Sequence, residues 1–256
     1  MDGLVIRDLH TGYRHKKIID GLTTPQLPRG QITALLGPNG SGKSTLLRAL
    51  ADLNPAQGSI RLNGEELTTQ PSAKRAQKVV YLPQSLPAGV HLHALESVIV
   101  ARRASGNSHG DAQTEALAIL EKLGVGHLAM HYLDQLSGGQ KQLIGLAQSL
   151  IRQPDLLLLD EPLSALDLNY QFHVMDIVAR ETRLRNIVTV VVIHDINIAL
   201  RHAQYAVMLK TGALIASGIP DEVVTPPNLA TVYGVRGRVE RCSQGLPHVV
   251  VDGLTT

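Results

Sequence analysis

The feature that most constrains this chain is a glycine-rich segment, residues 37–45, which follows directly on the apolar run Ile32–Leu36. It fits the pattern G-x-x-x-x-G-K-[ST], and leucines recur after it at helical spacing, so we predict a buried strand, a loop and a helix. Its glycines let the backbone curl until several N–H groups converge on one point, where a phosphate group fits. Lys43 adds a positive charge for the β- and γ-phosphates, and the hydroxyl of Ser44 suits Mg²⁺. The segment therefore predicts that a nucleoside triphosphate is bound by Gly37, Pro38, Asn39, Gly40, Ser41, Gly42, Lys43, Ser44 and Thr45.

Composition narrows the range of partners. The formal net charge of the 256 residues is only +2 and no block rich in Lys and Arg occurs, which argues against a nucleic-acid-binding surface. The single cysteine, Cys242, excludes an internal disulfide framework and fits a reducing compartment. No apolar run approaches the roughly 20 residues that a membrane-spanning helix needs, and no signal peptide is visible. We therefore expect that any work at a membrane is done through a partner.

Strand and helix patterns alternate on both sides of a helical insert. Short apolar runs predict strands, among them residues 4–9, 17–19, 59–62, 79–82, 156–159 and 188–193. Between residues 91 and 152 the apolar residues fall instead at three- and four-residue spacing, which predicts helices. Such an order is typical of a mainly parallel sheet wrapped by helices. We expect an α/β fold with a core and an antiparallel β region in residues 1–90 and 153–235, an inserted α-helical subdomain in 91–152, and a β-rich tail in 236–256.

Two carboxylates follow directly on a run of four leucines. Residues 156–159 predict a strand buried on both faces, and the carboxyl end of such a strand lies beside the phosphate-binding loop. Asp160 is then placed to hold Mg²⁺, through water, as phosphoryl transfer requires. Glu161 is placed to orient or deprotonate an attacking water. The alternative is a pair of solvated acids that end a strand, and the four preceding leucines argue against it.

A second segment, residues 136–140, predicts another phosphate contact. Ser137 is suited to cap a helix whose first N–H groups are free, and Gly138 and Gly139 leave the backbone open to close approach. Taken alone, the segment is also compatible with an ordinary glycine turn. With the first loop, it gives one chain two phosphate-binding helix N-termini on different lobes. One nucleotide does not need both from one chain, which favours two chains arranged head to tail.

With these motifs in order, the whole chain resembles the nucleotide-binding subunit of an ATP-binding-cassette (ABC) transporter. Residues 37–45 match the Walker A loop, residues 136–140 match the signature, and Asp160 and Glu161 match Walker B and its catalytic glutamate. The remaining matches are Tyr13 for the aromatic residue that stacks on adenine, Gln84 for the Q-loop, Asp167 for the D-loop (164–167) and His194 for the switch histidine. Taken singly, Tyr13, Gln84 and His194 would be read as ordinary residues; their order and spacing favour the family roles.

The resemblance implies a P-loop NTPase fold, hydrolysis of ATP, and Mg²⁺ as cofactor. The implied catalytic residues are Glu161, His194 and Gln84, and the implied magnesium contacts are Ser44, Gln84 and, through water, Asp160. Residues implied to act on the nucleotide of a second copy are Ser137, Gly138, Gly139, Gln140 and Asp167. The other implied partners are integral-membrane permease subunits and, indirectly, a solute-binding protein, with no nucleic acid. The expected location is the cytoplasmic face of the inner membrane.

A metal site built on the histidines at 91, 93, 127 and 131 is rejected, because no Cys, Asp or Glu completes a ligand set at suitable spacing.

A narrower resemblance links residues 160–218 and the tail around Tyr233 to the ATPases of iron-siderophore importers, a subfamily that includes haem and vitamin B12 importers. Gln148 departs from that pattern, since such proteins usually have arginine there, and residues 143–145 are also less usual. The leading expectation is import of a ferric siderophore, with haem or vitamin B12 as alternatives. A soluble ABC ATPase of iron–sulphur cluster assembly is the rival of another class. The sequence does not identify the transported molecule, because a permease and a binding protein would select it.

Overall fold

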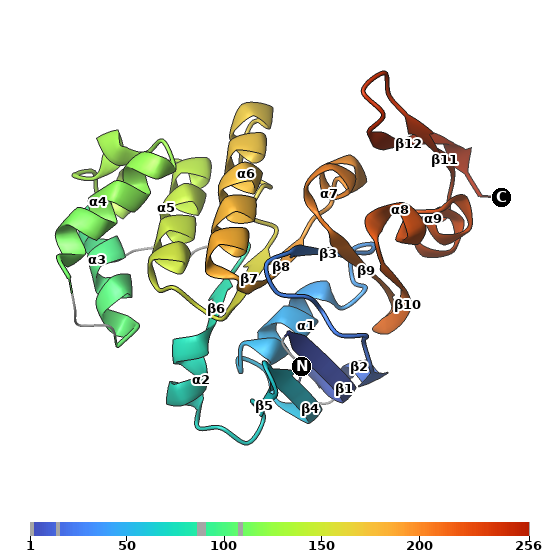
Figure 1. The fold of residues 1–256 in the computed structure, drawn as a ribbon, viewed down its shortest axis with the longest axis horizontal. Helices are drawn as coiled ribbons and strands as arrows, with labels where there is room; N and C mark the ends of the chain where they lie inside the picture. Colours follow the sequence, from blue (N-terminus) through green and yellow to red (C-terminus); the bar gives the residue numbers. More distant parts are fainter. Residues whose placement is uncertain (1–2, 14–15, 86–90, 107–109, 256) are drawn as a thin grey trace.

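The computed structural model describes residues 3–13, 16–85, 91–106 and 110–255, and its centre is a six-stranded sheet (Figure 1). The strand order is β10-β9-β3-β8-β7-β6, and all neighbours are parallel except β10 and β9, which form an antiparallel hairpin. The strands are β3 (Ile32–Leu36), β6 (Val79–Leu82), β7 (Leu156–Asp160), β8 (Val188–Val192), β9 (Tyr205–Lys210) and β10 (Ala213–Gly218). Three of them, β3, β7 and β8, are buried along their whole length, which explains their almost continuous apolar content. The mainly parallel sheet confirms the predicted fold class.

A second, antiparallel sheet packs over the helix that follows the glycine-rich loop. Its order is β2-β1-β4-β5, formed by β1 (Leu4–Tyr13), β2 (Lys16–Leu22), β4 (Ala56–Leu62) and β5 (Glu65–Glu66). Helix α1 (Lys43–Leu50) lies between the two sheets, and its Leu46, Leu47 and Leu50 share one buried cluster with residues of both. Because α1 is packed from both sides, the loop that precedes it is firmly anchored.

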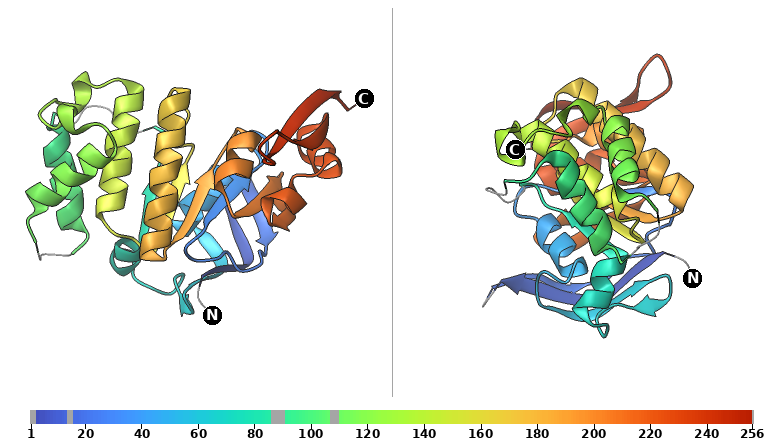
Figure 2. Two further views of the ribbon diagram at one scale, coloured as in Figure 1. Left: turned by 45° about the horizontal axis from the view of Figure 1, so that its top comes forward. Right: turned by 90° about the vertical axis from the view of Figure 1, so that its left-hand side faces the viewer.

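The helical insert forms a lobe at one end of the molecule (Figure 2). It contains α3 (Ala94–Ala104), α4 (Ala112–Lys122) and α5 (Gly138–Ile151), with the short turns η1 (Gly126–Leu128) and η2 (Leu133–Gln135) between α4 and α5. Helix α6 (Leu168–Arg185) lies between α5 and the C-terminal part. The buried carboxylate of Glu181 on α6 pairs with Lys122 of α4 and with Arg185. One acid thus links the lobe to the core.

The C-terminal part lies at the opposite end of the molecule. Three helices, α7 (Ile196–His202), α8 (Pro220–Val223) and α9 (Pro226–Tyr233), are followed by a hairpin of β11 (Val235–Arg241) and β12 (Pro247–Leu254). The N–H of Val249 donates to Asn197 Oδ1 at 2.7 Å, which attaches the hairpin to α7. The tail thus consists mainly of the two strands β11 and β12. None of the helices in the described ranges is long and apolar enough to cross a bilayer.

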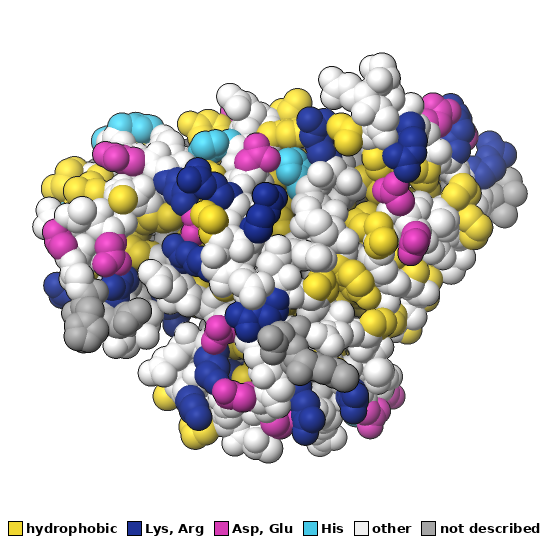
Figure 3. Space-filling model, in the orientation of Figure 1, with side chains coloured by type: hydrophobic (Ala, Val, Ile, Leu, Met, Phe, Trp, Pro, Cys, Tyr) yellow, Lys and Arg dark blue, Asp and Glu magenta, His cyan; other side chains and the backbone are white. Residues whose placement is uncertain are grey.

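Charged side chains of both signs are mixed on the face shown in Figure 3. Lys and Arg are interspersed with Asp and Glu there, which matches the small formal net charge of +2. The described part of this face therefore carries charges of both signs.

Helix α2 (Ser72–Lys78) escaped the sequence analysis because it has no apolar stripe. A buried arginine holds it instead, since Arg75 Nη2 donates to the carbonyls of Ala49 and Leu50, at 2.7 and 2.8 Å, at the end of α1. Strand β1 was also predicted too short, because its alternation of apolar and polar residues is interrupted. The register of its pairing with β4 shifts between Arg7 and His10, so the strand continues to Tyr13 although its alternation is broken.

Glu66 gives the antiparallel sheet a stability that depends on pH. Its carboxylate accepts hydrogen bonds from Ser59 Oγ (2.5 Å), Thr68 Oγ1 (2.7 Å) and the N–H of Ile60 (2.9 Å). Burial raises the pKa of Glu66, but these hydrogen bonds outweigh burial and lower the pKa from its ordinary 4.5 to about 2. Because the folded pKa lies below the unfolded one, the stabilisation is complete above the unfolded value and is lost as the pH falls toward the folded one.

We expect Glu66→Gln to lower the free energy of unfolding by about 1.5–3 kcal/mol at neutral pH, as for a lost hydrogen bond to a charged group. The difference from the native chain should shrink as the pH approaches 2, which urea unfolding at several pH values measures. Glu222→Gln, an exposed acid on α8, is the control and should change little. A loss for Glu66→Gln that is the same at every pH would contradict this explanation.

Candidate nucleotide-binding site

The glycine-rich loop lies at the carboxyl end of β3, in the middle of the sheet. Gly37 adopts φ +146°, and a Cβ there would collide with the carbonyl oxygen of Leu209 on β9, so a larger residue does not fit. Helix α1 begins at Lys43, directly after the loop, and the N–H groups of its first turn have no partner within the helix. The loop therefore joins a fixed strand end to a helix N-terminus, as anion binding requires.

The side chain of Lys43 folds back over its own loop. Its Nζ donates to the carbonyls of Gly37 and Pro38, at 2.7 and 3.0 Å, and the residue is 5% exposed. Burial lowers the pKa of Lys43, while Glu161 and Asp160 act in the opposite direction. A phosphate in the loop would therefore meet a partly desolvated ammonium group, which attracts it more strongly than a solvated one.

Asp160 is buried and is held by two hydroxyl groups. Ser44 Oγ donates to its Oδ1 at 3.0 Å, and the Tyr81 hydroxyl donates to its Oδ2 at 2.9 Å. Burial raises the pKa of Asp160 above its usual range in spite of these two bonds. The structure thus brings the predicted pair Ser44 and Asp160 into contact and adds Tyr81, which the sequence analysis missed because tyrosine is an ordinary strand residue.

The residues at this point suit a magnesium ion. The Ser44 hydroxyl and the Asp160 carboxylate are hard oxygen donors of the kind that Mg²⁺ prefers. Their contact places both at the junction of α1 and β7, beside the loop that would hold the phosphates. The donor set therefore fits the implied cofactor.

Glu161 contacts the other two predicted catalytic residues. Gln84 Nε2 donates to Glu161 Oε2 at 2.5 Å, and His194 Nε2 lies 2.5 Å from Glu161 Oε1. Glu161 has φ +53°, a left-handed conformation, which costs a non-glycine residue about 1–2 kcal/mol. Backbone strain of this kind is typical of functional sites. Here it coincides with the meeting of three predicted catalytic side chains.

These residues line one cavity of about 390 Å³. From the predicted set, its lining includes Asn39, Gly40, Gly42, Lys43, Ser44, Thr45, Gln84, Glu161 and His194. The predicted adenine-stacking residue, Tyr13, is not among them and is 46% exposed at the end of β1. Ile18 of β2 lines the cavity instead, although a lone apolar strand residue gave no sign of this. The adenine contact of Tyr13 stays a prediction.

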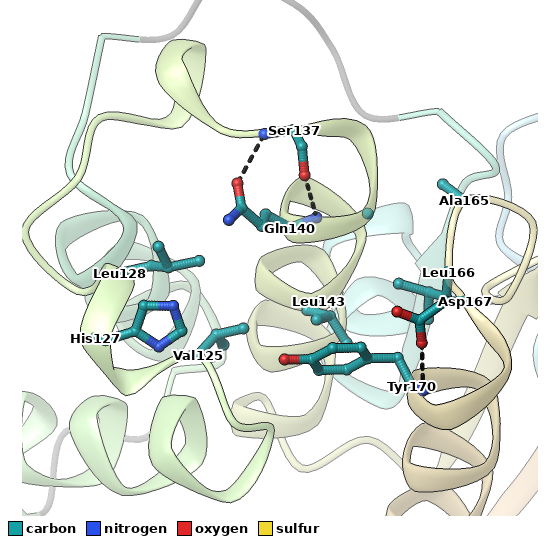
Figure 4. A pocket seen from close by; sticks show the side chains of 11 residues that line it. Val125, His127, Leu128, Ser137, Gln140, Leu143, Ala165, Leu166, Asp167 and Tyr170 are labelled. Carbon is teal, nitrogen blue, oxygen red and sulfur yellow. Dashed lines mark hydrogen bonds between the residues drawn. The ribbon is translucent and has the colours of Figure 1, made fainter.

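The second predicted phosphate contact lies in a different cavity, of about 210 Å³ (Figure 4). Ser137 and Gln140 form a capping box there: Ser137 Oγ accepts from the Gln140 N–H at 3.3 Å, and the Ser137 N–H donates to Gln140 Oε1 at 2.9 Å. The D-loop borders the same cavity, where Asp167 caps α6 through the N–H of Tyr170 at 3.0 Å. Among the described residues, none lines both cavities. One chain therefore keeps its two predicted groups of phosphate contacts apart.

Gly139 is constrained by the D-loop of its own chain. A Cβ at Gly139 would lie 2.7 Å from the carbonyl oxygen of Ala165, whereas one at Gly138 would have its nearest neighbour, Ala165 Cβ, at 3.9 Å. We expect Gly139→Ala to destabilise the protein by about 1–3 kcal/mol through overpacking. Gly138→Ala, the matched control, should stabilise it by up to about 1 kcal/mol because alanine favours a helix. Urea unfolding measures both, and equal effects would show that the D-loop contact does not constrain Gly139.

Gln148, which departs from the siderophore-importer pattern, lies inside the helical lobe. Its Nε2 donates to Ser97 Oγ at 2.9 Å and so links α5 to α3. It lines neither of the two cavities. The departure therefore concerns packing within the lobe and not the phosphate contacts.

Known proteins resemble this chain over nearly its whole length. Residues 23–164 match the family model described as ABC transporter. The achromobactin transport ATP-binding protein CbrD of Dickeya dadantii is 34% identical, over 93% of this chain and 90% of its own length. The hemin import ATP-binding protein HmuV of Gloeobacter violaceus is 36% identical, over 92% of this chain and 89% of its own. A solved structure described as a metal-chelate type ABC transporter in an inward-facing conformation has a TM-score of 0.81 at 26% identity and covers 98% of both chains. The likeness thus includes the sheet, the helical lobe and the tail.

Proposed function

Because this chain belongs to the ABC transporter family, we propose that it is the ATP-hydrolysing subunit of an importer that takes up a ferric siderophore through a membrane permease. The observation that supports hydrolysis is the position of Glu161. It lines the same cavity as Lys43 and Ser44, and its carboxylate contacts Gln84 and His194. The similarity to CbrD and to a metal-chelate type transporter favours an iron chelate as the cargo.

In the proposed site, the phosphates of ATP lie on residues 37–45 and the adenine on Tyr13, a stacking contact of about 1–3 kcal/mol. Lys43 faces the β- and γ-phosphates. Ser44, Asp160 and Gln84 would hold Mg²⁺, which neutralises the charge on the phosphate oxygens. Glu161 orients the attacking water and accepts its proton, and His194 steadies the Glu161 carboxylate.

The separation of the two cavities supports a composite site built by two copies. Ser137 and Gly139 lie away from the phosphate loop of their own chain, so a nucleotide on that loop would meet them only on a second copy. Head-to-tail pairing then lets each of two ATP molecules join both copies, with Gly138, Gln140 and Asp167 beside Ser137. Loss of the γ-phosphate removes the shared ligand, and the dimer opens. A near-complete switch needs about 5 kcal/mol of differential affinity, which two nucleotides would supply together.

The proposed location is the cytoplasmic face of the inner membrane, bound to permease subunits that receive cargo from a solute-binding protein. The helical lobe and the segment that carries Gln84 would transmit closure of the dimer to the permease. Haem is the second candidate cargo, because HmuV is as similar to this chain as CbrD is. Vitamin B12 is a weaker alternative, and the transport names of these relatives argue against iron–sulphur cluster assembly.

Growth of a deletion strain on single iron sources tests the cargo. We expect growth to fail on a ferric siderophore, to persist on haem, and to be restored by the native chain but not by Lys43→Ala. Failure on haem alone would favour the second candidate. Unchanged growth on every iron source would contradict iron import, but it would not contradict ATP hydrolysis by this chain.

A further inference from the structure

One segment of the chain contacts both successive acids at the end of β7. Strands β6 and β7 are parallel neighbours, with Tyr81 opposite Leu158. From this register the Tyr81 hydroxyl reaches Asp160 Oδ2 at 2.9 Å. Three residues later, Gln84 Nε2 reaches Glu161 Oε2 at 2.5 Å. The position of β6 therefore sets the position of two hydrogen-bond donors, one to the predicted metal contact Asp160 and one to the predicted catalytic base Glu161.

Helix α1 supplies a second hydroxyl donor to Asp160. Ser44 holds the other oxygen of Asp160 at 3.0 Å. Arg48, one helical turn after Ser44, brings its positive charge near the Tyr81 hydroxyl, and its Nε donates to Asn54 Oδ1 at 3.1 Å. Each oxygen of the Asp160 carboxylate thus has its own hydroxyl donor, one from α1 and one from β6.

We propose that Tyr81 is a positioning residue for the magnesium site, acting through Asp160. With Ser44 as its single partner, the Asp160 carboxylate would be free to rotate about its Cβ–Cγ bond, and the Tyr81 hydroxyl removes that freedom. Partners that orient metal ligands in this way typically change metal affinity by about 10–100-fold. Since Tyr81 and Gln84 belong to the same short segment, a shift of that segment moves the donor to Asp160 and the donor to Glu161 together.

Tyr81→Phe tests the proposal because it removes the hydroxyl and keeps the ring. The probe is Mn²⁺, which suits the same oxygen ligands as Mg²⁺, measured by electron paramagnetic resonance with ADP present so that no hydrolysis is required. We expect Mn²⁺ to bind about tenfold more weakly, and ADP without metal to bind as in the native chain. Tyr205→Phe on β9 is the matched control and should change neither, because the Tyr205 hydroxyl has no hydrogen bond within the described part of the chain.

Unchanged Mn²⁺ affinity in Tyr81→Phe overturns the proposal. A thermal melt without ligands establishes that the variant is folded. Should it fail to fold, Tyr81→Met is the second variant, because methionine fills much of the same space without a hydroxyl. Weaker Mn²⁺ binding by Tyr81→Met then supports the proposal, and unchanged binding overturns it. Steady-state hydrolysis separates positioning from chemistry, because saturating Mg²⁺ should restore most of the rate of Tyr81→Phe. A loss of kcat that saturating Mg²⁺ does not restore contradicts the positioning role. None of these measurements depends on which molecule is transported.

Discussion

Glu161→Gln is expected to accumulate as a dimer that retains ATP. Glutamine has nearly the shape of glutamate and still faces Gln84 and His194, but it does not accept a proton from water. Loss of a general base lowers turnover by about 10²–10⁴-fold, while the phosphate contacts of residues 37–45 remain. Gel filtration with ATP and Mg²⁺ should give an apparent mass about twice that found without nucleotide, as for a closed twofold dimer.

The matched control is Glu222→Gln, which makes the same charge change at an exposed position on α8. It should hydrolyse ATP at the native rate and return to a monomer once ATP is consumed. A Glu161→Gln variant that stays monomeric with ATP and still releases phosphate rapidly would contradict the role assigned to Glu161.

Ser137→Arg is expected to abolish turnover and to leave nucleotide binding by the isolated subunit unchanged. The arginine would fill the second cavity, where Ser137 lies exposed at the N-terminus of α5, and would exclude a partner's γ-phosphate. Loss of a preorganised donor at a reacting oxyanion costs about 10²–10³-fold in rate. The first cavity shares no described lining residue with the second, so ATP affinity of the monomer, measured by fluorescence titration, should not fall.

Ser137→Ala tests whether the effect of Ser137→Arg comes from filling the second cavity or from loss of the helix cap. It removes the capping oxygen that accepts the Gln140 N–H, at a cost of about 1 kcal/mol in stability, but it leaves the cavity open. We expect it to retain much more activity than Ser137→Arg. Collapse of ATP binding by monomeric Ser137→Arg would show that one chain forms the site alone.

Mixing two inactive variants tests the composite site directly. In a head-to-tail dimer of Lys43→Ala with Ser137→Arg, one site carries both lesions and the other carries neither. Random pairing should therefore restore about a quarter of the native sites. No restoration at any ratio, with mixed dimers demonstrated by differential tagging, would place both halves of the site in one chain.

Much of this site was predictable because its parts obey local rules. The residues of β3, β7 and β8 are apolar enough to be identified as buried strands, and the carboxyl ends of parallel strands meet at one edge of a sheet. That edge brings Glu161 to His194, which follows β8, and to Gln84, which follows β6. Helix α2 was not predictable in this way, because the contact that holds it is a buried arginine on the end of another helix.

By itself, the sequence determined the class of ligand, the mainly parallel sheet and the acids at its edge, since each is written in a short run of neighbouring residues. Only the tertiary structure decided that the Tyr81 hydroxyl donates to Asp160 and that the carbonyl of Ala165 leaves no space for a side chain at Gly139. Both contacts join elements that lie tens of residues apart in the sequence. Residue spacing along the chain does not show which side chains come within hydrogen-bonding distance when such elements pack.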